Sequence, residues 1–226
     1  MISLENRWLQ LSEVKVIAPD VPYSAYTPLD LSIHNTDLTN HNLITSADFE
    51  NYIENHLKQN QAQIAFGGYN ETRNLYKRSS VFNSSEQEER NIHLGLDLWT
   101  AAGTPILAAL DGIIHSFKDN NQLGDYGPTI ILEHKIDTQP FYTLYGHLSL
   151  KSIQHLTKGQ MVKKGQTIAT LGNASVNGDY APHLHFQIIK NIQNKEGDYP
   201  GVCSLSTLPF YLSNCPDPNL LLKINS

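Results

Sequence analysis

The stretch that most constrains this chain is residues 181–189, with the sequence APHLHFQII. Apolar and polar residues alternate along it, which predicts a β-strand with one buried face. Because side chains two positions apart share one face of a strand, His183, His185 and Gln187 should stand together. Two imidazoles beside one another suit a metal site, but two histidines on a half-exposed strand would give the same pattern.

A second alternating stretch, residues 92–99, predicts another strand on which His93, Gly95 and Asp97 share one face. Gly95 has no side chain, and we expect it to leave room there for an ion and its water. A polar face on a solvent-exposed edge strand is the alternative interpretation. Catalytic zinc sites take three nitrogen or oxygen ligands from the protein and leave a fourth position for water.

Combining the two stretches supplies such a set: His93, Asp97 and one of the two histidines at 183 and 185. The other histidine of the pair would then be free to transfer protons, as hydrolysis requires. His147 ends another short apolar segment, where its aromatic neighbours fit a core equally well.

Capping residues and turn residues indicate how the chain is divided. Residues 1–64 are expected to form an N-terminal extension with one helix, capped by Thr45 or Ser46, and residues 65–226 the main domain. The main domain alternates short apolar segments with turns rich in Gly, Asn, Asp and Pro, which predicts a mainly β, antiparallel architecture. The expected strands cover residues 92–99, 105–110, 113–117, 129–134, 141–147, 167–171 and 183–189.

Charge and hydropathy restrict the partners. The 226 residues carry 16 Lys plus Arg against 22 Asp plus Glu, a net charge of −6, without a basic run. We therefore expect no nucleic acid partner and no electrostatic docking on a membrane. An apolar run of about 18 residues is missing, so no membrane span is expected. Residues 1–20 show no signal peptide, from which we expect a cytoplasmic location unless a signal has been removed.

The two cysteines, Cys203 and Cys215, do not form a CxxC motif or a disulfide framework. They are expected to be reduced and buried, while a single disulfide stays possible on the sequence alone.

Three motifs occur in the order HxxxD, GH and HxH: His93 with Asp97, then His147, then His183 with His185. The flanking sequences GTP at 103–105, DG at 111–112 and YTLYGHLS at 142–149 accompany them. Over about residues 90–190 the chain resembles the lysostaphin/LytM-type zinc metallopeptidases of the M23 family.

The resemblance implies a fold, a cofactor and roles. The fold would be an antiparallel duplicated hybrid motif, similar to a barrel-sandwich hybrid. The cofactor would be Zn²⁺, with His93, Asp97 and His185 as metal ligands. His183 would be the general base and His147 an assisting catalytic group. The activity would be that of a metalloendopeptidase-type hydrolase, in which water on the zinc attacks a peptide or amide bond.

The substrate stays open between two classes. Typical M23 enzymes cut peptides of peptidoglycan and read Ser/Thr-Gly-Pro-His before the HxH pair, where this chain has DYAPH at 179–183. Residues 67–73 and 215–218 resemble M23-like domains fused in other proteins to aminotransferase and phosphotransferase-like domains, which would imply a small cytosolic amide or peptide. The alternatives to an enzyme are a non-catalytic M23-like zinc-binding or partner-regulating module and a structural zinc domain. An enzyme that acts on non-peptide bonds is a further alternative.

Overall fold

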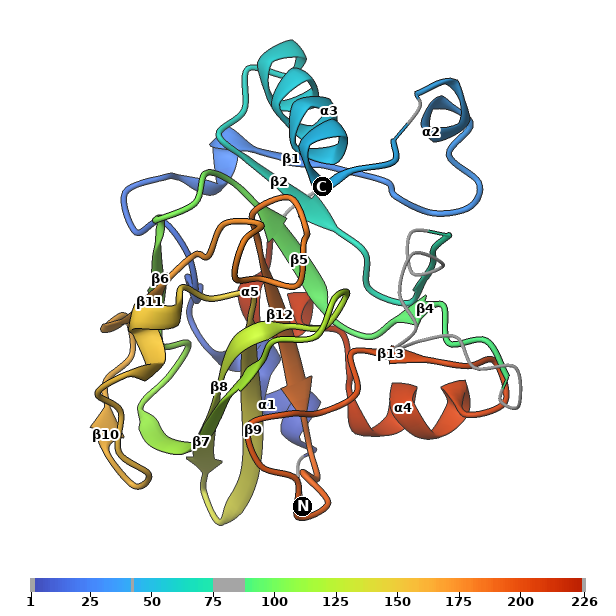
Figure 1. Cartoon of the computed structure of the whole chain (residues 1–226). Coiled ribbons are helices and arrows are strands. Elements are labelled where there is room, and N and C mark those ends of the chain that lie inside the picture. The colour runs from blue at the N-terminus through green and yellow to red at the C-terminus, as the bar shows by residue number, and fades with distance from the viewer. Residues whose placement is uncertain (1–2, 42, 75–87, 225–226) are drawn as a thin grey trace.

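The expected mainly β fold is confirmed. The computed structural model describes residues 3–41, 43–74 and 88–224, and its centre is an eight-stranded sheet in the order β1-β2-β5-β12-β9-β8-β7-β10 (Figure 1). Neighbouring strands pair antiparallel except β1 and β2, which are parallel. The strands are β1 (Tyr26–Pro28), β2 (Ile64–Gly67), β5 (Leu96–Trp99), β7 (Gly112–Asn120), β8 (Gly127–Ile136), β9 (Gln139–Gly146), β10 (Met161–Val162) and β12 (His183–Ile189).

Two small sheets flank the large one. One pairs β6 (Pro105–Leu107) with β11 (Thr167–Thr170), and the other has the order β13-β4-β3, with β13 (Val202–Cys203), β4 (Ile92–His93) and β3 (Glu71–Thr72). The single strand expected over residues 92–99 is therefore wrong, because β4 and β5 belong to different sheets. Every residue from Ile92 to Trp99 is buried, so the polar alternation does not mark a solvent-exposed face.

The N-terminal extension holds its expected helix, α3 (Ser46–Gln59), which Thr45 caps in a reciprocal capping box with Asp48. It also holds two helices that were not predicted, α1 (Leu4–Gln10) and α2 (Asp37–Asn40). Trp8 lies in α1 and is fully buried in the main core cluster. The extension thus shares a core with the main domain, and the division at residue 64 stays a prediction.

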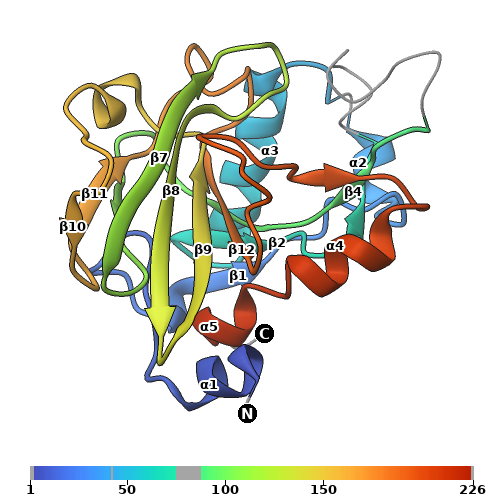
Figure 2. The same ribbon diagram turned by 90° about the horizontal axis from the view of Figure 1, so that it is seen from below.

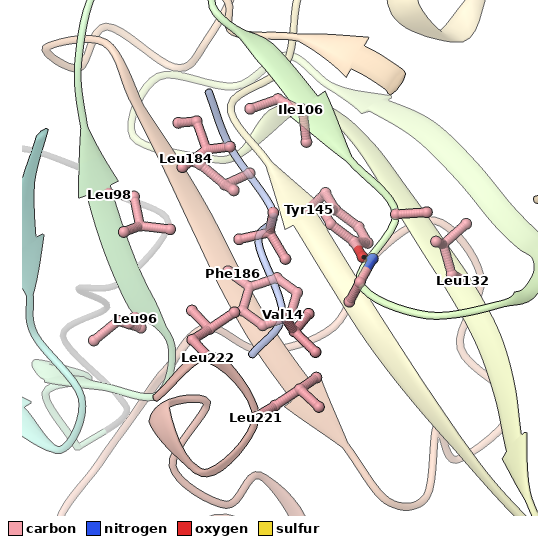
Figure 3. Packing of buried hydrophobic residues seen from close by; sticks show 14 of the residues in the cluster. Val14, Leu96, Leu98, Ile106, Leu132, Tyr145, Leu184, Phe186, Leu221 and Leu222 are labelled. Carbon is pink, nitrogen blue, oxygen red and sulfur yellow. Dashed lines mark hydrogen bonds between the residues drawn. The ribbon is translucent and has the colours of Figure 1, made fainter. Parts of the chain in front are cut away.

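The main core lies against one face of the large sheet. Leu184 and Phe186 of β12 pack there with Leu96 and Leu98 of β5 (Figure 3). Helix α5 (Asn219–Leu222) adds two leucines to this core and contacts α1, beside which it lies in Figure 2. Because neighbouring side chains of a strand point to opposite faces, the histidines of β12 face away from this core.

The C-terminal part holds a further helix and both cysteines. Helix α4 (Leu208–Asn214) was not predicted, and the nearby Cys203 and Cys215 are both buried free thiols.

Among the residues that the structure describes, none of the helices is long and apolar enough to cross a bilayer.

Candidate metal centre and active site

Strand pairing brings the predicted site residues together. In the ladder between β5 and β12, His185 lies directly opposite Asp97. His93 comes from β4, whose ladder with β3 and β13 runs beside this pair. His147 follows immediately after β9, and its neighbour Gly146 is the partner of His185 in the next ladder. Residues nearly a hundred positions apart therefore share one site.

The first part of the site is a cluster of His93, Asp97 and His185, each at most 2% exposed. One ligand atom from each lies within 4.8 Å of the other two. His93 Nε2 is 2.8 Å from His185 Nδ1, and Asp97 Oδ1 is 3.3 Å from the former and 3.2 Å from the latter. These are the three residues expected to bind the metal.

The outer hydrogen bonds of the two rings determine which nitrogen carries a proton. His93 donates from Nδ1 to the Gly68 carbonyl at 2.9 Å. His185 donates from Nε2 to Gln187 Oε1 at 2.9 Å. The Gln187 amide group donates to the Pro200 carbonyl and contacts Cys215 Sγ, so its oxygen must be the acceptor. In the neutral state, both inward nitrogens therefore carry lone pairs.

This donor set fits a zinc ion. Two lone pairs 2.8 Å apart, next to a carboxylate, cannot satisfy one another without a proton or a cation. Two imidazoles and one carboxylate are ligands that zinc accepts, and outer partners such as the Gly68 carbonyl and Gln187 orient metal-binding histidines in this way.

Charge within the cluster also favours a cation. Burial opposes the ionisation of Asp97, but the neighbouring His93 and the Arg73 guanidinium outweigh it and hold the pKa of this carboxyl well below its usual range. Burial lowers the pKa of His93 to about 4. At neutral pH the carboxylate is ionised and the His93 ring is neutral, as metal ligation requires.

Two further histidines complete the site. His183 donates from Nδ1 to the Ala181 carbonyl at 2.7 Å, and His147 donates from Nδ1 to the Asn177 carbonyl at 2.8 Å. Both rings therefore keep an unprotonated Nε2, and their centroids are 4.1 Å apart. The Nε2 atom of His183 lies 3.9 Å from Asp97 Oδ1. Burial lowers the pKa of both rings.

His147 has an unusual backbone, with a φ of 63° in the left-handed region. Such a conformation is costly for a residue with a side chain and is often found at functional sites. Here it turns the chain directly after β9, and the His147 amide donates to the Tyr126 carbonyl at 2.9 Å. The strain places the ring against His183.

A cavity of about 260 Å³ opens onto all five residues. Leu31, Phe49 and Ile53 of the N-terminal extension line it, together with Tyr126 and Tyr180. The extension therefore contributes to the cavity.

Some residues that shape the site were not predicted, or were predicted to have another role. Arg73 and Gly68 were not predicted as site residues, because no periodicity in the sequence marks them. Gly95 was expected to leave room for an ion and its water, but a Cβ there would lie 2.5 Å from the His185 ring. Gly95 thus makes room for the His185 ring, at the point where the chain passes from β4 to β5.

Comparisons with known proteins find similarity over one segment of the chain. Residues 91–196 match the model for Peptidase family M23. The peptidoglycan DD-endopeptidase ShyC of Vibrio cholerae is 36% identical over 100 residues, which are 44% of this chain and 20% of that protein. The uncharacterized lipoprotein YgeR of Escherichia coli is 37% identical over 94 residues, 42% of this chain and 33% of YgeR. The chain thus spans a third or less of these relatives.

Among solved structures, the catalytic domain of the antimicrobial peptidase lysostaphin from Staphylococcus simulans is similar to this chain. The two are 29% identical with a TM-score of 0.38, over 54% of this chain and 80% of that one.

The expected cytoplasmic location is wrong. YgeR and the NlpD/LppB homolog of Pseudomonas aeruginosa are named as lipoproteins, and ShyC is named for peptidoglycan, so the relatives point to an extracytoplasmic location. The expectation depended on residues 1–20 alone, and these lie outside the part of the chain that matches the family.

All five predicted site residues lie within the matched segment, whereas Gly68 and Arg73 precede it. The matched segment includes the strands β5, β9 and β12, whose pairing assembles the site. Residues 91–196 of this chain are a domain of peptidase family M23.

Proposed function

We propose that this chain is a zinc-dependent metallopeptidase of the endopeptidase type, which hydrolyses an amide bond in a peptidoglycan-type peptide. The observation that carries the proposal is the buried cluster of His93, Asp97 and His185, with two further histidines beside it. Membership of the matched segment in a peptidase family supports the same reaction class.

In this proposal, zinc would be held by His93 Nε2, His185 Nδ1 and Asp97 Oδ1. Zinc at this position supplies Lewis acidity, which lowers the pKa of water to about 7 and polarises an amide carbonyl. The supporting observation is the hydrogen bonding of the outer nitrogen of each ring, which turns these two nitrogens toward Asp97 and toward each other.

His183 is proposed as the general base. Its Nδ1–H is held by the Ala181 carbonyl, so Nε2 is the atom that accepts a proton. Nε2 would take a proton from water as the water oxygen attacks the amide carbon, and would return it to the amine nitrogen as the C–N bond breaks. His147 presents its Nε2 beside the same ring and would donate a hydrogen bond to the substrate oxygen once protonated.

A peptide substrate is supported by the cavity and by the relatives. ShyC is named as a peptidoglycan DD-endopeptidase, and the lysostaphin domain as an antimicrobial peptidase. The cavity combines an apolar wall at Phe49 and Ile53 with charged groups at Arg90 and Lys195. Such a mixed lining suits a short peptide that carries both apolar and charged groups.

The test combines metal analysis with substrate hydrolysis. The purified protein would be assayed for zinc and then incubated with purified peptidoglycan and with synthetic stem peptides, with product masses read by mass spectrometry. We expect one zinc per chain and cleavage at an amide bond. His183→Ala should keep zinc and lose at least about 100-fold in kcat, in the range of general-base contributions.

The matched control is His155→Ala, which removes an exposed histidine that does not line the cavity. It should behave like the parent protein. Zinc retention without cleavage of any of these substrates would favour a non-catalytic zinc-binding module, and the absence of zinc would refute the proposal.

A further inference from the structure

We infer that Arg73 is a positioning residue that fixes Asp97 for metal binding and connects the site to the segment before the M23 domain. The inference rests on the proposed zinc site and adds a residue that lies outside the matched segment.

Arg73 is buried, 2% exposed, and its guanidinium group donates to two carboxylates of the described part of the chain. Nη1 donates to Asp97 Oδ2 at 2.6 Å, and Nε donates to Glu71 Oε2. The guanidinium carbon lies 5.7 Å from the centre of the Trp99 ring. Two charge-assisted hydrogen bonds and an aromatic neighbour hold the group in one orientation.

The contact with Arg73 decides which oxygen Asp97 offers. Because Oδ2 is engaged by Nη1, Oδ1 is the atom that faces His93 and His185, at 3.3 and 3.2 Å. The carboxylate is thereby prepared to bind a metal through one oxygen. A lysine at position 73 could not make both hydrogen bonds in this geometry, since its ammonium group is a compact charge without the planar, spaced donors of a guanidinium group.

The chain of contacts continues into the N-terminal extension. Glu71 Oε1 accepts from the Leu31 amide at 3.2 Å, and the Ile33 amide donates to the Thr72 carbonyl at 2.9 Å. The Asp97 carboxylate is therefore connected to residue 31 through Arg73 and Glu71. All residues in this series of contacts except Asp97 precede residue 91.

Gly68 also helps to position the residues of the site. Its carbonyl accepts from His93, and its φ is 102°. A Cβ at this position would lie 1.9 Å from Arg73 Nη2 and 3.0 Å from His93 Nδ1. Residues 67–73 therefore orient two of the three proposed ligands, His93 and Asp97, from one side.

A purely structural role for Arg73 would be to neutralise Glu71 in the protein interior. The two roles differ in a double variant. In Glu71→Gln with Arg73→Met, the buried Glu71 charge and its partner disappear together, so this charge balance is kept. Asp97 still loses its Arg73 hydrogen bond, so a positioning role predicts weak metal binding even though this balance is maintained.

The experiment measures zinc affinity by competition with a chromophoric chelator, the visible absorption of the Co²⁺-loaded protein, and the Tm of each metal-free variant. We expect Arg73→Met and the double variant to bind zinc 10–100-fold more weakly, the usual effect of removing such a partner. Arg73→Lys should lie between them and the parent, and the Co²⁺ spectrum should change in each. Glu71→Gln alone is the matched control and should bind zinc within about threefold of the parent, because Arg73 Nη1 still reaches Asp97.

Parent-like zinc affinity and Co²⁺ spectra in Arg73→Met would overturn the inference. The inference would also be overturned if the double variant had the zinc affinity and the Co²⁺ spectrum of the parent. If Arg73→Met does not fold, the double variant and Arg73→Lys decide the question. Failure of the parent protein to bind zinc would instead refute the proposed function, so the two failures are distinguishable.

Discussion

His93 Nε2 and His185 Nδ1 lie 2.8 Å apart, although each ring donates its single N–H to a different partner, the Gly68 carbonyl or Gln187. Two facing lone pairs repel each other unless a proton or a metal ion lies between them. The folded protein thus keeps a buried pair of nitrogens in an arrangement that a cation would stabilise.

Zinc should therefore stabilise the folded protein. A ligand that binds only the native state at 100 times its Kd adds about 2.7 kcal/mol, or roughly 5–10 °C in Tm for a chain of this size. We expect this rise when zinc is added to chelator-treated protein, measured by differential scanning fluorimetry. His93→Ala should show at most a small rise; an equal rise in this variant would place the zinc elsewhere.

The Gln187 side chain should control zinc affinity through His185. Gln187→Leu removes the acceptor for the His185 N–H, which frees the ring to change tautomer, and should weaken zinc binding 10–100-fold. It should also cost about 1–3 kcal/mol of stability, since a buried N–H loses its partner. Gln187→Glu keeps an acceptor and should retain zinc. Equal affinities in chelator competition for Gln187→Leu and Gln187→Glu would contradict this role.

Substitution of Gly95 should disrupt the same ring sterically. In Gly95→Ala the new Cβ would lie 2.5 Å from Cε1 and Nε2 of His185, so the ring must move. We expect loss of stoichiometric zinc, measured by atomic absorption, and a lower Tm. Gly103→Ala is the control, because a Cβ there meets nothing within 4 Å. Its φ of 85° should cost about 1 kcal/mol while zinc is kept.

His134, which does not line the cavity, should make the fold sensitive to acid. It is buried between the Asp111 carbonyl and Thr143 Oγ1, and burial lowers its pKa to about 4. The unfolded chain takes up a proton below about pH 6.5, which the folded ring does not accept until about pH 4. This group therefore removes stability as the pH falls through that window, by roughly 2 kcal/mol at pH 5.

The measurement is the free energy of unfolding in urea at pH 7 and pH 5, with chelator present throughout. His134→Gln should lose less stability between the two pH values than the parent, whatever its stability at pH 7. Equal losses in the two proteins would show that His134 is not the responsible group.

The sequence by itself determined the local parts of the site. The alternation over residues 183–189 predicted β12 with its bounds and placed His183 and His185 on one face, because a strand repeats every two residues. The capping residues of α3 were equally local. The motif order also identified the five residues that the structure brings together.

Only the tertiary structure decided how those parts meet. The register of β12 against β5 places His185 opposite Asp97, and the separation of β4 from β5 directs His93 to them from another sheet. Nothing in the spacing of residues 92–99 reveals that break, since all of them are buried and the polar positions face a site and not solvent. Arg73 shows no local pattern either, because its role depends on a carboxylate 24 positions away. Strand periodicity is set by the backbone within a few residues, whereas ligand geometry depends on pairing and burial between distant segments.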